Sequence, residues 1–97
     1  RADQRSKIKG MFVDPAQINV LLKRFDRVDR LRLTVSRAEE QDVMTLQVAT
    51  SDQTEGFQKE MSEALKDVTK LKGVVNLVPA GSLPNDGQVI VDERDYS

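Results

Sequence analysis

The order in which helical and strand-like apolar patterns follow one another is the feature that most restricts the fold of this chain. Residues 18–25 and 57–71 place apolar side chains at helical spacing. Four other stretches have the composition of strands, two of them alternating and two short and apolar; they are residues 8–13, 31–36, 43–49 and 74–78. The resulting order is β-α-β-β-α-β. It predicts one α+β domain, because 97 residues are near the common domain size.

Local signals predict the ends of both helices. Asp14 to Gln17 (D-P-A-Q) indicates a capped start, with proline in the first turn and a capping box. Asp52 and Glu55 predict a second capping box, and Gly73 is predicted to stop the second helix. A polar turn, residues 38–42, joins the two alternating strands and indicates an antiparallel hairpin.

The remaining segments complete the predicted sheet. Gly10 interrupts the first strand and indicates a bend or bulge, whereas the apolar run of residues 74–78 predicts a strand that is central or covered on both faces. Residues 79–87, rich in proline and glycine, predict a structured loop, and residues 89–91 predict one short extra strand. We therefore predict a ferredoxin-like sandwich with its helices on one face of the sheet, a C-terminal loop and a short extra strand.

The composition excludes several kinds of active site. The chain has no cysteine and no histidine, so it lacks a thiolate nucleophile, the usual general base near neutral pH and the commonest metal ligands. Its carboxylates gather at residues 39–42 and 92–95, in a predicted turn and at the C-terminal end, where solvation explains them. A glycine-rich phosphate loop of the P-loop or Rossmann type is also missing. We expect no metal site and no autonomous active site.

Charge is unevenly distributed, although the net charge is only −1. Residues 1–37 carry ten Lys/Arg and four Asp/Glu, whereas residues 38–97 carry five and twelve. The basic N-terminal part is explained either by solvation or by an anionic partner. The small net charge and an aromatic content of 4% argue against nucleic-acid binding. No apolar run reaches the ~20 residues of a membrane span, so no membrane partner and a cytoplasmic location are expected.

Two segments are more elaborate than the fold requires: R-A-D-Q-R-S-K-I-K-G at residues 1–10 and G-S-L-P-N-D-G-Q at residues 81–88. The first resembles the hinge-and-loop motif that opens the C-terminal domain of adenylate-forming enzymes. M-F-V-D-P at residues 11–15 and the loop at 81–87 are similar to phenylacetate–CoA ligases and related aryl-CoA ligases. The core stretches D-V-M-T-L-Q-V and V-T-K-L-K-G extend the resemblance over nearly the whole chain.

This resemblance implies the small C-terminal lid of an ATP-dependent aryl- or arylacetate-CoA ligase. Such enzymes join a carboxylate to ATP, rotate the small domain and then transfer the acyl group to coenzyme A. Residues 1–10 would be the hinge and mobile loop, and residues 11–97 the lid, after a large N-terminal adenylation domain of the same chain. A start at Arg1, without methionine, fits a piece of such a chain. ATP with Mg and coenzyme A would bind the full-length enzyme, and the isolated domain is expected to be inactive.

The resemblance also implies site residues by position. Asp3 matches the hinge, where a few backbone torsions absorb the rotation. Gly10 matches the loop that enters the coenzyme A channel, where a glycine lets the backbone approach closely. Lys7 and Lys9 precede it and are explained equally well by coenzyme A phosphates and by simple solvation.

The adenylation loop, with Pro84 and Gly87, contains one departure from the family pattern. The family places a lysine after this glycine to orient the carboxylate and phosphate, whereas this chain has Gln88. Glutamine donates hydrogen bonds but brings no positive charge. An engineered substitution, a natural protein that adenylates weakly, and a substitute cation are the three explanations, with Lys72 and Arg94 the basic residues nearest in sequence. We expect weak adenylation and a less affected thioester step.

A free-standing ferredoxin-like regulatory or ligand-binding module is the alternative interpretation. Such a module would dimerise through its sheet edges or helices and would bind its small molecule without a larger domain.

Overall fold

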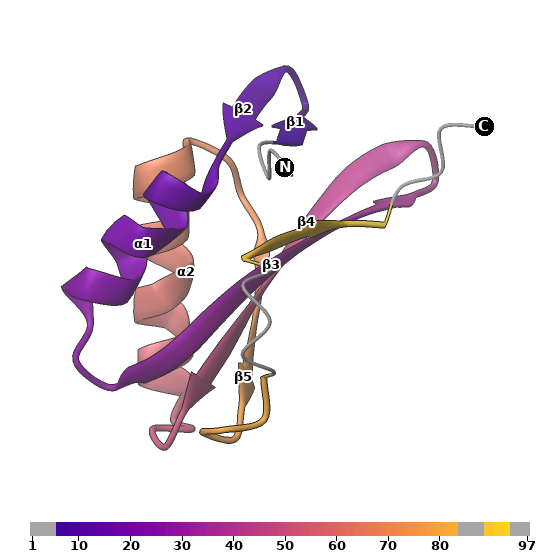
Figure 1. The fold of residues 1–97 in the computed structure, drawn as a ribbon. Helices are drawn as coiled ribbons and strands as arrows, with labels where there is room; N and C mark the ends of the chain where they lie inside the picture. Colours follow the sequence, from indigo (N-terminus) through magenta and orange to yellow (C-terminus); the bar gives the residue numbers. More distant parts are fainter. Residues whose placement is uncertain (1–5, 84–88, 94–97) are drawn as a thin grey trace.

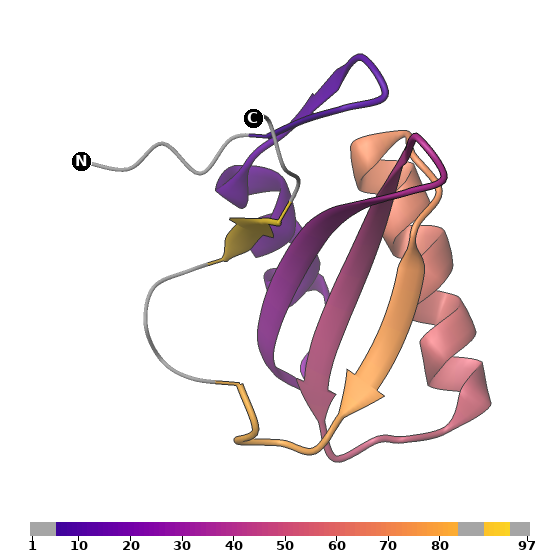
Figure 2. The same cartoon turned by 90° about the vertical axis from the view of Figure 1, so that its right-hand side faces the viewer.

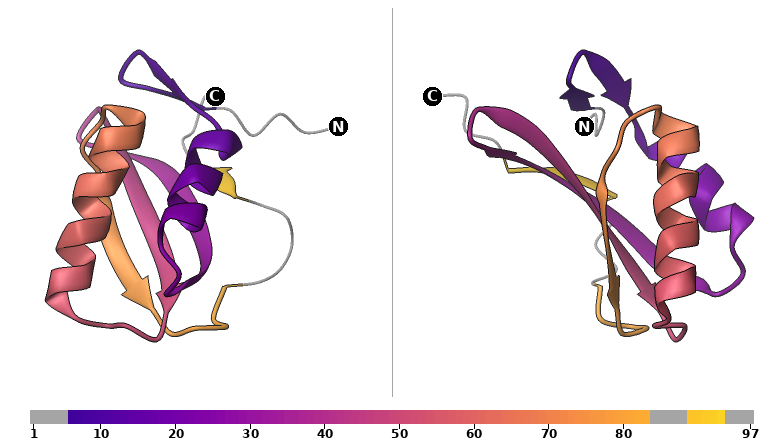
Figure 3. Two further views of the ribbon diagram at one scale, coloured as in Figure 1. Left: turned by 90° about the vertical axis from the view of Figure 1, so that its left-hand side faces the viewer. Right: turned by 180° about the vertical axis from the view of Figure 1, so that it is seen from behind.

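A sheet and the two helices that cover one of its faces form the body of the domain (Figures 1 and 3). The computed structural model describes residues 6–83 and 89–93. The elements of this body are α1 (Pro15–Arg24), β3 (Val28–Ala38), β4 (Gln41–Thr50), α2 (Glu55–Thr69), β5 (Val74–Val78) and β6 (Ile90–Asp92). The strand order is β5-β4-β3-β6, with β3 and β4 antiparallel and each outer strand parallel to its neighbour. The predicted α+β, ferredoxin-like class with helices on one face is confirmed.

The first predicted strand is a hairpin beside this sheet rather than a bent strand within it. β1 (Ser6–Ile8) pairs antiparallel with β2 (Met11–Val13) in a separate two-stranded sheet. The chain reverses at Lys9 and Gly10, whose φ angles are 51° and 85°. These left-handed conformations are those of a type I′ turn, which reverses the chain completely. The sheet edge beside β3 is filled instead by β6, the predicted extra strand.

The β3–β4 hairpin is the centre of the sheet, as the alternating pattern predicts. Leu33 pairs with Leu46 and Val35 pairs with Met44, and all four side chains are buried. The turn is narrower than predicted, because only Glu39–Glu40 lies between the strands, with φ angles of 53° and 66°. The inward-facing residues of this hairpin therefore supply the sheet side of the core.

One apolar core lies between the sheet and the helices, and the β1–β2 hairpin contributes to it. Ile8 and Val13 are buried together with the inward side chains of the strands. The helices bury Ile18, Leu21, Phe57, Met61, Ala64 and Leu65 against them. The small hairpin is thus fixed to the body of the domain by two fully buried side chains.

α1 begins at the predicted capping box. Asp14 Oδ1 accepts a hydrogen bond from the amide of Gln17 at 3.2 Å, and the Asp14 amide donates to Gln17 Oε1 at 3.1 Å. Pro15 follows at the first helical position, where no amide hydrogen is needed. The prediction for this helix start is confirmed in both of its hydrogen bonds.

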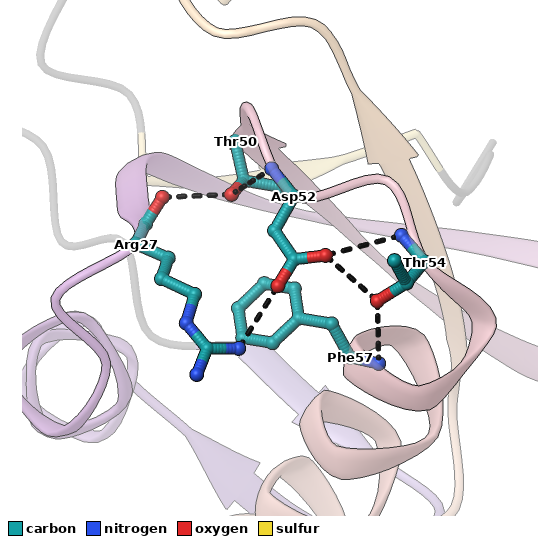
Figure 4. Close-up of polar contacts among 5 residues, drawn as sticks. All are labelled: Arg27, Thr50, Asp52, Thr54 and Phe57. Atoms are coloured by element: carbon teal, nitrogen blue, oxygen red, sulfur yellow. Dashed lines mark hydrogen bonds and ion pairs between the residues drawn. The ribbon is translucent and has the colours of Figure 1, made fainter.

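α2 begins differently from the prediction, because its N-cap is Thr54 rather than Asp52. The Thr54 hydroxyl oxygen accepts from the amide of Phe57 at 3.3 Å. Asp52 binds the cap itself: its Oδ1 accepts from the Thr54 hydroxyl at 2.7 Å and from the Thr54 amide at 3.2 Å (Figure 4). The predicted capping box of Asp52 and Glu55 is wrong, since the nearer threonine hydroxyl reaches the free amide of the first turn.

Four polar residues, Arg27, Thr50, Asp52 and Thr54, join the start of α2 to the turn after α1 (Figure 4), and we call them the Asp52 brace. Asp52 Oδ2 accepts from the Arg27 guanidinium at 2.9 Å. The Thr50 hydroxyl donates to the Arg27 carbonyl at 2.7 Å and accepts from the Asp52 amide at 3.1 Å. The same guanidinium lies 5.4 Å from the centre of the Phe57 ring. The brace therefore holds the α1–β3 connection against the β4–α2 connection at one end of the sheet.

The prediction that Gly73 stops α2 is wrong, because the helix ends before this residue and the glycine serves close packing instead. The helix ends at Thr69, and Lys70 adopts the left-handed C-cap conformation with φ 66°. A Cβ on Gly73 would lie 2.9 Å from Leu65 Cδ2 and 3.0 Å from the Met44 carbonyl oxygen. The glycine is therefore required by its contact with the backbone of β4.

β5 lies at an edge of the described sheet and exposes one of its faces, which contradicts the prediction of a strand that is central or covered on both faces. Val75 is buried, but its neighbour Val74 is 51% exposed. A short apolar run does not reveal how many strands will pair beside it, and this ambiguity explains the error.

Gly56 in α2 and Gly73 after it allow a matched test of the packing role of Gly73. Gly73→Ala is expected to destabilise the protein by about 1–3 kcal/mol, because the new methyl group meets fixed backbone. Gly56→Ala is expected to stabilise it by about 0.5–1 kcal/mol, because Gly56 is helical and a Cβ there meets nothing within 4 Å. Urea unfolding measures both changes. Equal effects of the two substitutions would contradict the packing role of Gly73.

The Asp52 brace predicts a pH dependence of stability. Hydrogen bonds from the Thr54 hydroxyl and amide, and then from Arg27, hold the pKa of Asp52 below its usual value of 3.8. Asp52 therefore stabilises the fold above that pH, and the contribution is lost as the pH falls through the lowered pKa. Asp52→Asn should be less stable than the original protein at pH 7, and the difference should shrink between about pH 5 and pH 2. A difference in unfolding free energy that stays constant over this range would refute the expectation.

Candidate functional site

The β1–β2 hairpin has one side fixed in the core and one side turned outward. Ile8 and Val13, on the inner side, are 1% and 0% exposed. Lys7 and Phe12 form a cross-strand pair on the opposite side, with the Lys7 ammonium 5.8 Å from the ring centre. Phe12 is 58% exposed. The hairpin therefore presents a cation and an aromatic ring on a rigid support.

The turn of this hairpin requires a glycine for its backbone conformation and not for packing. Gly10 has a φ of 85°, and a Cβ on it would meet nothing within 4 Å. The space over the turn is therefore open to another molecule. Lys7, Lys9 and Gly10, which the sequence grouped as one loop, lie together on this hairpin.

A carboxylate from a distant strand holds the turn in place. The Lys9 amide donates to Asp42 Oδ2 at 3.1 Å, and Arg37 Nη2 lies 3.7 Å from Asp42 Oδ1. The sequence assigned Asp42 to a solvated acidic turn and missed this role. Because 33 residues separate the two partners, no local pattern could have indicated the contact.

The described part of the loop after β5 is also bound to the sheet. The Ser82 amide donates to the Pro79 carbonyl at 3.0 Å, which closes a turn at residues 79–82. The Gly81 amide donates to Asp29 Oδ2 at 3.1 Å, and Arg30 Nη1 donates to the Leu83 carbonyl at 3.2 Å. The beginning of β3 therefore fixes the path of this loop as far as residue 83.

The hairpin and the described part of this loop lie at opposite ends of the sheet (Figures 1 and 2). The remaining residues implied by the resemblance, Asp3, Pro84, Gly87 and Gln88, lie outside the described residues, as does Arg94. Lys72 is described and exposed, in the connection between α2 and β5. Of the predicted site residues, the structure therefore brings together the hairpin set alone.

Residues 6–83 and 89–93 contain no group of three or more carboxylates that could hold a metal ion. No helix among them is long and apolar enough to cross a membrane.

Asp42→Ala provides a test of the contact that holds the hairpin turn. Loss of the side-chain acceptor should lower the hydrogen-exchange protection of the Lys9 amide about 5- to 10-fold, as expected for a hydrogen bond worth about 1 kcal/mol. Protection of core amides such as that of Leu46 should stay unchanged, because the contact lies outside the core. A uniform loss of protection across β4 would mean that Asp42 supports the whole fold instead.

Comparisons with known proteins identify the family. Residues 10–94 match the family of AMP-binding enzyme C-terminal domains. A domain of phenylacetate-coenzyme A ligase from Bacteroides vulgatus ATCC 8482 superposes with a TM-score of 0.86 at 28% identity, over 98% of this chain and 97% of that one. Among curated proteins, no relative was found.

The same fold forms part of a larger ligase. 2-Hydroxyisobutyryl-CoA ligase with 2-HIB-AMP and CoA, in the thioesterification state, matches with a TM-score of 0.85 at 23% identity and 98% coverage of this chain. Its postadenylation state, with R3-HIB-AMP, matches with a TM-score of 0.78 at 22% identity and 96% coverage. This chain spans only 22% of the length of that ligase. The resemblance inferred from the motifs is confirmed: the chain belongs to the family of C-terminal domains of AMP-binding, adenylate-forming enzymes.

Proposed function

We propose that this chain is the mobile C-terminal domain of an ATP-dependent aryl- or arylacetate-CoA ligase. The observation that carries the proposal is the family match over residues 10–94, together with the likeness to a phenylacetate-coenzyme A ligase domain over nearly the whole of both chains. The partner would be a large N-terminal adenylation domain of the same chain. The substrates would be an aryl or arylacetic acid, ATP with Mg and coenzyme A, in the cytoplasm.

The proposed enzyme works in two half-reactions. In the first, a carboxylate oxygen of the acid attacks the α-phosphorus of ATP, giving an acyl-adenylate and pyrophosphate. In the second, the thiol of coenzyme A attacks the acyl carbon, and AMP leaves. Separate surfaces at the two ends of this domain support a division of labour, in which each surface meets the large domain in one orientation. Asp3 would be the hinge between the orientations.

The β1–β2 hairpin has the properties that the second half-reaction needs. Gly10 leaves open space over the turn, so a narrow pantetheine chain can pass beside the backbone. Lys7 and Lys9 supply positive charge on the same hairpin for coenzyme A phosphates. The burial of Ile8 and Val13 keeps this turn in a fixed place relative to the body of the domain.

The adenylation loop is proposed to serve the first half-reaction, with Pro84 and Gly87 shaping it. Gln88 stands where the family has its lysine, so we expect slow adenylation and a less affected thioester step. A free-standing regulatory module remains the alternative, and it requires none of these activities.

Two glycines with nearly the same φ angle provide the test in the full-length protein. Gly10 and Gly81 have φ angles of 85° and 83°, and a Cβ on either meets nothing within 4 Å. Gly10→Leu and Gly81→Leu should therefore cost similar stability. Gly10→Leu should slow thioester formation from a prepared acyl-adenylate by about 100-fold, because a side chain obstructs the channel, whereas Gly81→Leu should not. Phenylacetate and benzoate are the first acids to assay.

Gln88→Lys completes this experiment through pyrophosphate exchange, which reports adenylation alone. A restored positive charge should raise exchange by about 10- to 1000-fold, with little change in the thioester step. Equal exchange by both proteins would refute the idea that Gln88 limits adenylation. If the unmodified protein and Gln88→Lys both lack exchange and thioester formation with every aryl acid, the ligase proposal fails and the regulatory module is favoured.

A further inference from the structure

One edge of the described sheet is open. β5 pairs with β4 on one side, and among residues 6–83 and 89–93 no strand pairs with its other side (Figure 2). An open edge presents a row of backbone donors and acceptors and can receive a further strand. β5 also leaves the side chain of Val74 51% exposed. The proposed roles of the β1–β2 hairpin and the loop after β5 use neither feature.

The hydrogen bonds of β5 show which of its residues face the open edge. In a parallel pair, successive residues direct their backbone groups alternately toward the neighbouring strand and away from it. The Val75 carbonyl accepts a hydrogen bond at 2.6 Å from Nε2 of Gln58, which lies on α2 and not on β4. Val75 therefore faces the open edge, and Leu77, two residues later, faces it as well.

The register counted from the other side of the sheet agrees. The Leu33 amide donates to the Val89 carbonyl, toward β6. Its antiparallel partner Leu46 therefore directs its own backbone groups toward β5. Val75 lies opposite Leu46 in the parallel pair, so its backbone groups point to the far side, which is the open edge.

The sequence of β5, V-V-N-L-V, is nearly symmetric about its central residue, Asn76. A two-fold axis through Asn76 would place Val75 of one copy opposite Leu77 of the other, in antiparallel pairing. These are the residues whose backbone groups face the edge, so donors and acceptors match in this register. The exposed Val74 would lie opposite Val78 of the second copy, which gives its apolar side chain a partner.

The two ends of the edge carry opposite charges. Lys70 and Lys72 are exposed between α2 and β5, where the strand begins. Glu55 begins α2 close to the end of the strand, since Gln53 nearby donates to the Val78 carbonyl at 3.0 Å. Antiparallel pairing brings the beginning of one strand beside the end of the other. The lysines of one copy would therefore lie toward the glutamate of the second copy.

We propose that the β5 edge pairs with the same edge of a second copy of this chain, antiparallel about Asn76, and that Gln58 limits this pairing. Gln58 is half-buried and donates to the Val75 carbonyl in the single domain. It thereby reduces the gain from adding a strand, because this carbonyl already has a partner. The inference is independent of the proposed function, since it uses neither the β1–β2 hairpin nor the loop after β5.

Sedimentation of this 97-residue chain over a concentration series is the first test. It should show a monomer–dimer equilibrium, and Gln58→Met should tighten it about tenfold or more, because the outward carbonyl then depends on the second copy. Gln53→Met is the matched control: Gln53 donates to the carbonyl of Val78, which faces β4, so association should change less than twofold. Equal tightening by both variants, or three monomeric proteins, would overturn the proposal.

A charge exchange at the two-fold axis tests the register. Asn76 is exposed and lies opposite itself in the proposed pair. Asn76→Lys and Asn76→Glu each place like charges about 5 Å apart, so each should weaken association about three- to tenfold at low salt. An equimolar mixture should restore it, and only folded domains can give that result. Unchanged association in either variant, or a mixture no tighter than its components, would contradict the register.

Amide hydrogen exchange separates a second copy from a segment of the proposed large domain. The Leu77 amide should gain protection about tenfold as the concentration rises past the dissociation constant, in the 97-residue chain and in the full-length protein. The Asn76 amide faces β4 and should change much less. Protection of the Leu77 amide in the full-length protein that is independent of concentration and of Asn76→Lys would mean that the same chain covers the edge, which would overturn pairing with a second copy.

Discussion

Burial of the inner face of the β3–β4 hairpin against the two helices is the contact on which the rest of the structure depends. Leu33, Leu46 and Val48 have no exposed surface, and each such side chain contributes about 1.5–3 kcal/mol when fully buried. Among residues 6–83 and 89–93, both helices lie against this face of the sheet and no helix lies on the opposite face (Figures 2 and 3). The β1–β2 hairpin and the described part of the loop after β5 are each attached to one end of this β3–β4 hairpin.

The strength of the periodic pattern decided which parts of the fold could be predicted. In β3 and β4 the alternation sets both the strands and their inner face, because a shift of one residue would expose the whole apolar set. α1 was equally clear, since Asp14, Pro15 and Gln17 all indicate the same start. The errors fall where two local signals compete, as at Asp52 and Thr54, or where one residue type has two uses, as at Gly73.

The candidate site was less predictable, because its contacts join residues far apart in sequence. The motif around Gly10 located the hairpin, but nothing near Lys9 in sequence indicates Asp42. Sequence patterns indicate the periodicity of each element, whereas a contact such as that of Asp42 with Lys9 depends on which elements become neighbours.

The dimensions of the domain bear on how two surfaces can serve one reaction centre. The molecule measures 38 Å along its longest axis, and the hairpin and the loop after β5 lie at opposite ends of the sheet. The buried anchors of the hairpin and the Asp52 brace resist internal bending, because moving either end would break core contacts or a set of linked hydrogen bonds. If both surfaces serve the same acyl-adenylate, as proposed, neither can reach it by local rearrangement. The whole domain must then reorient as one body, which is the rotation that the proposed function requires.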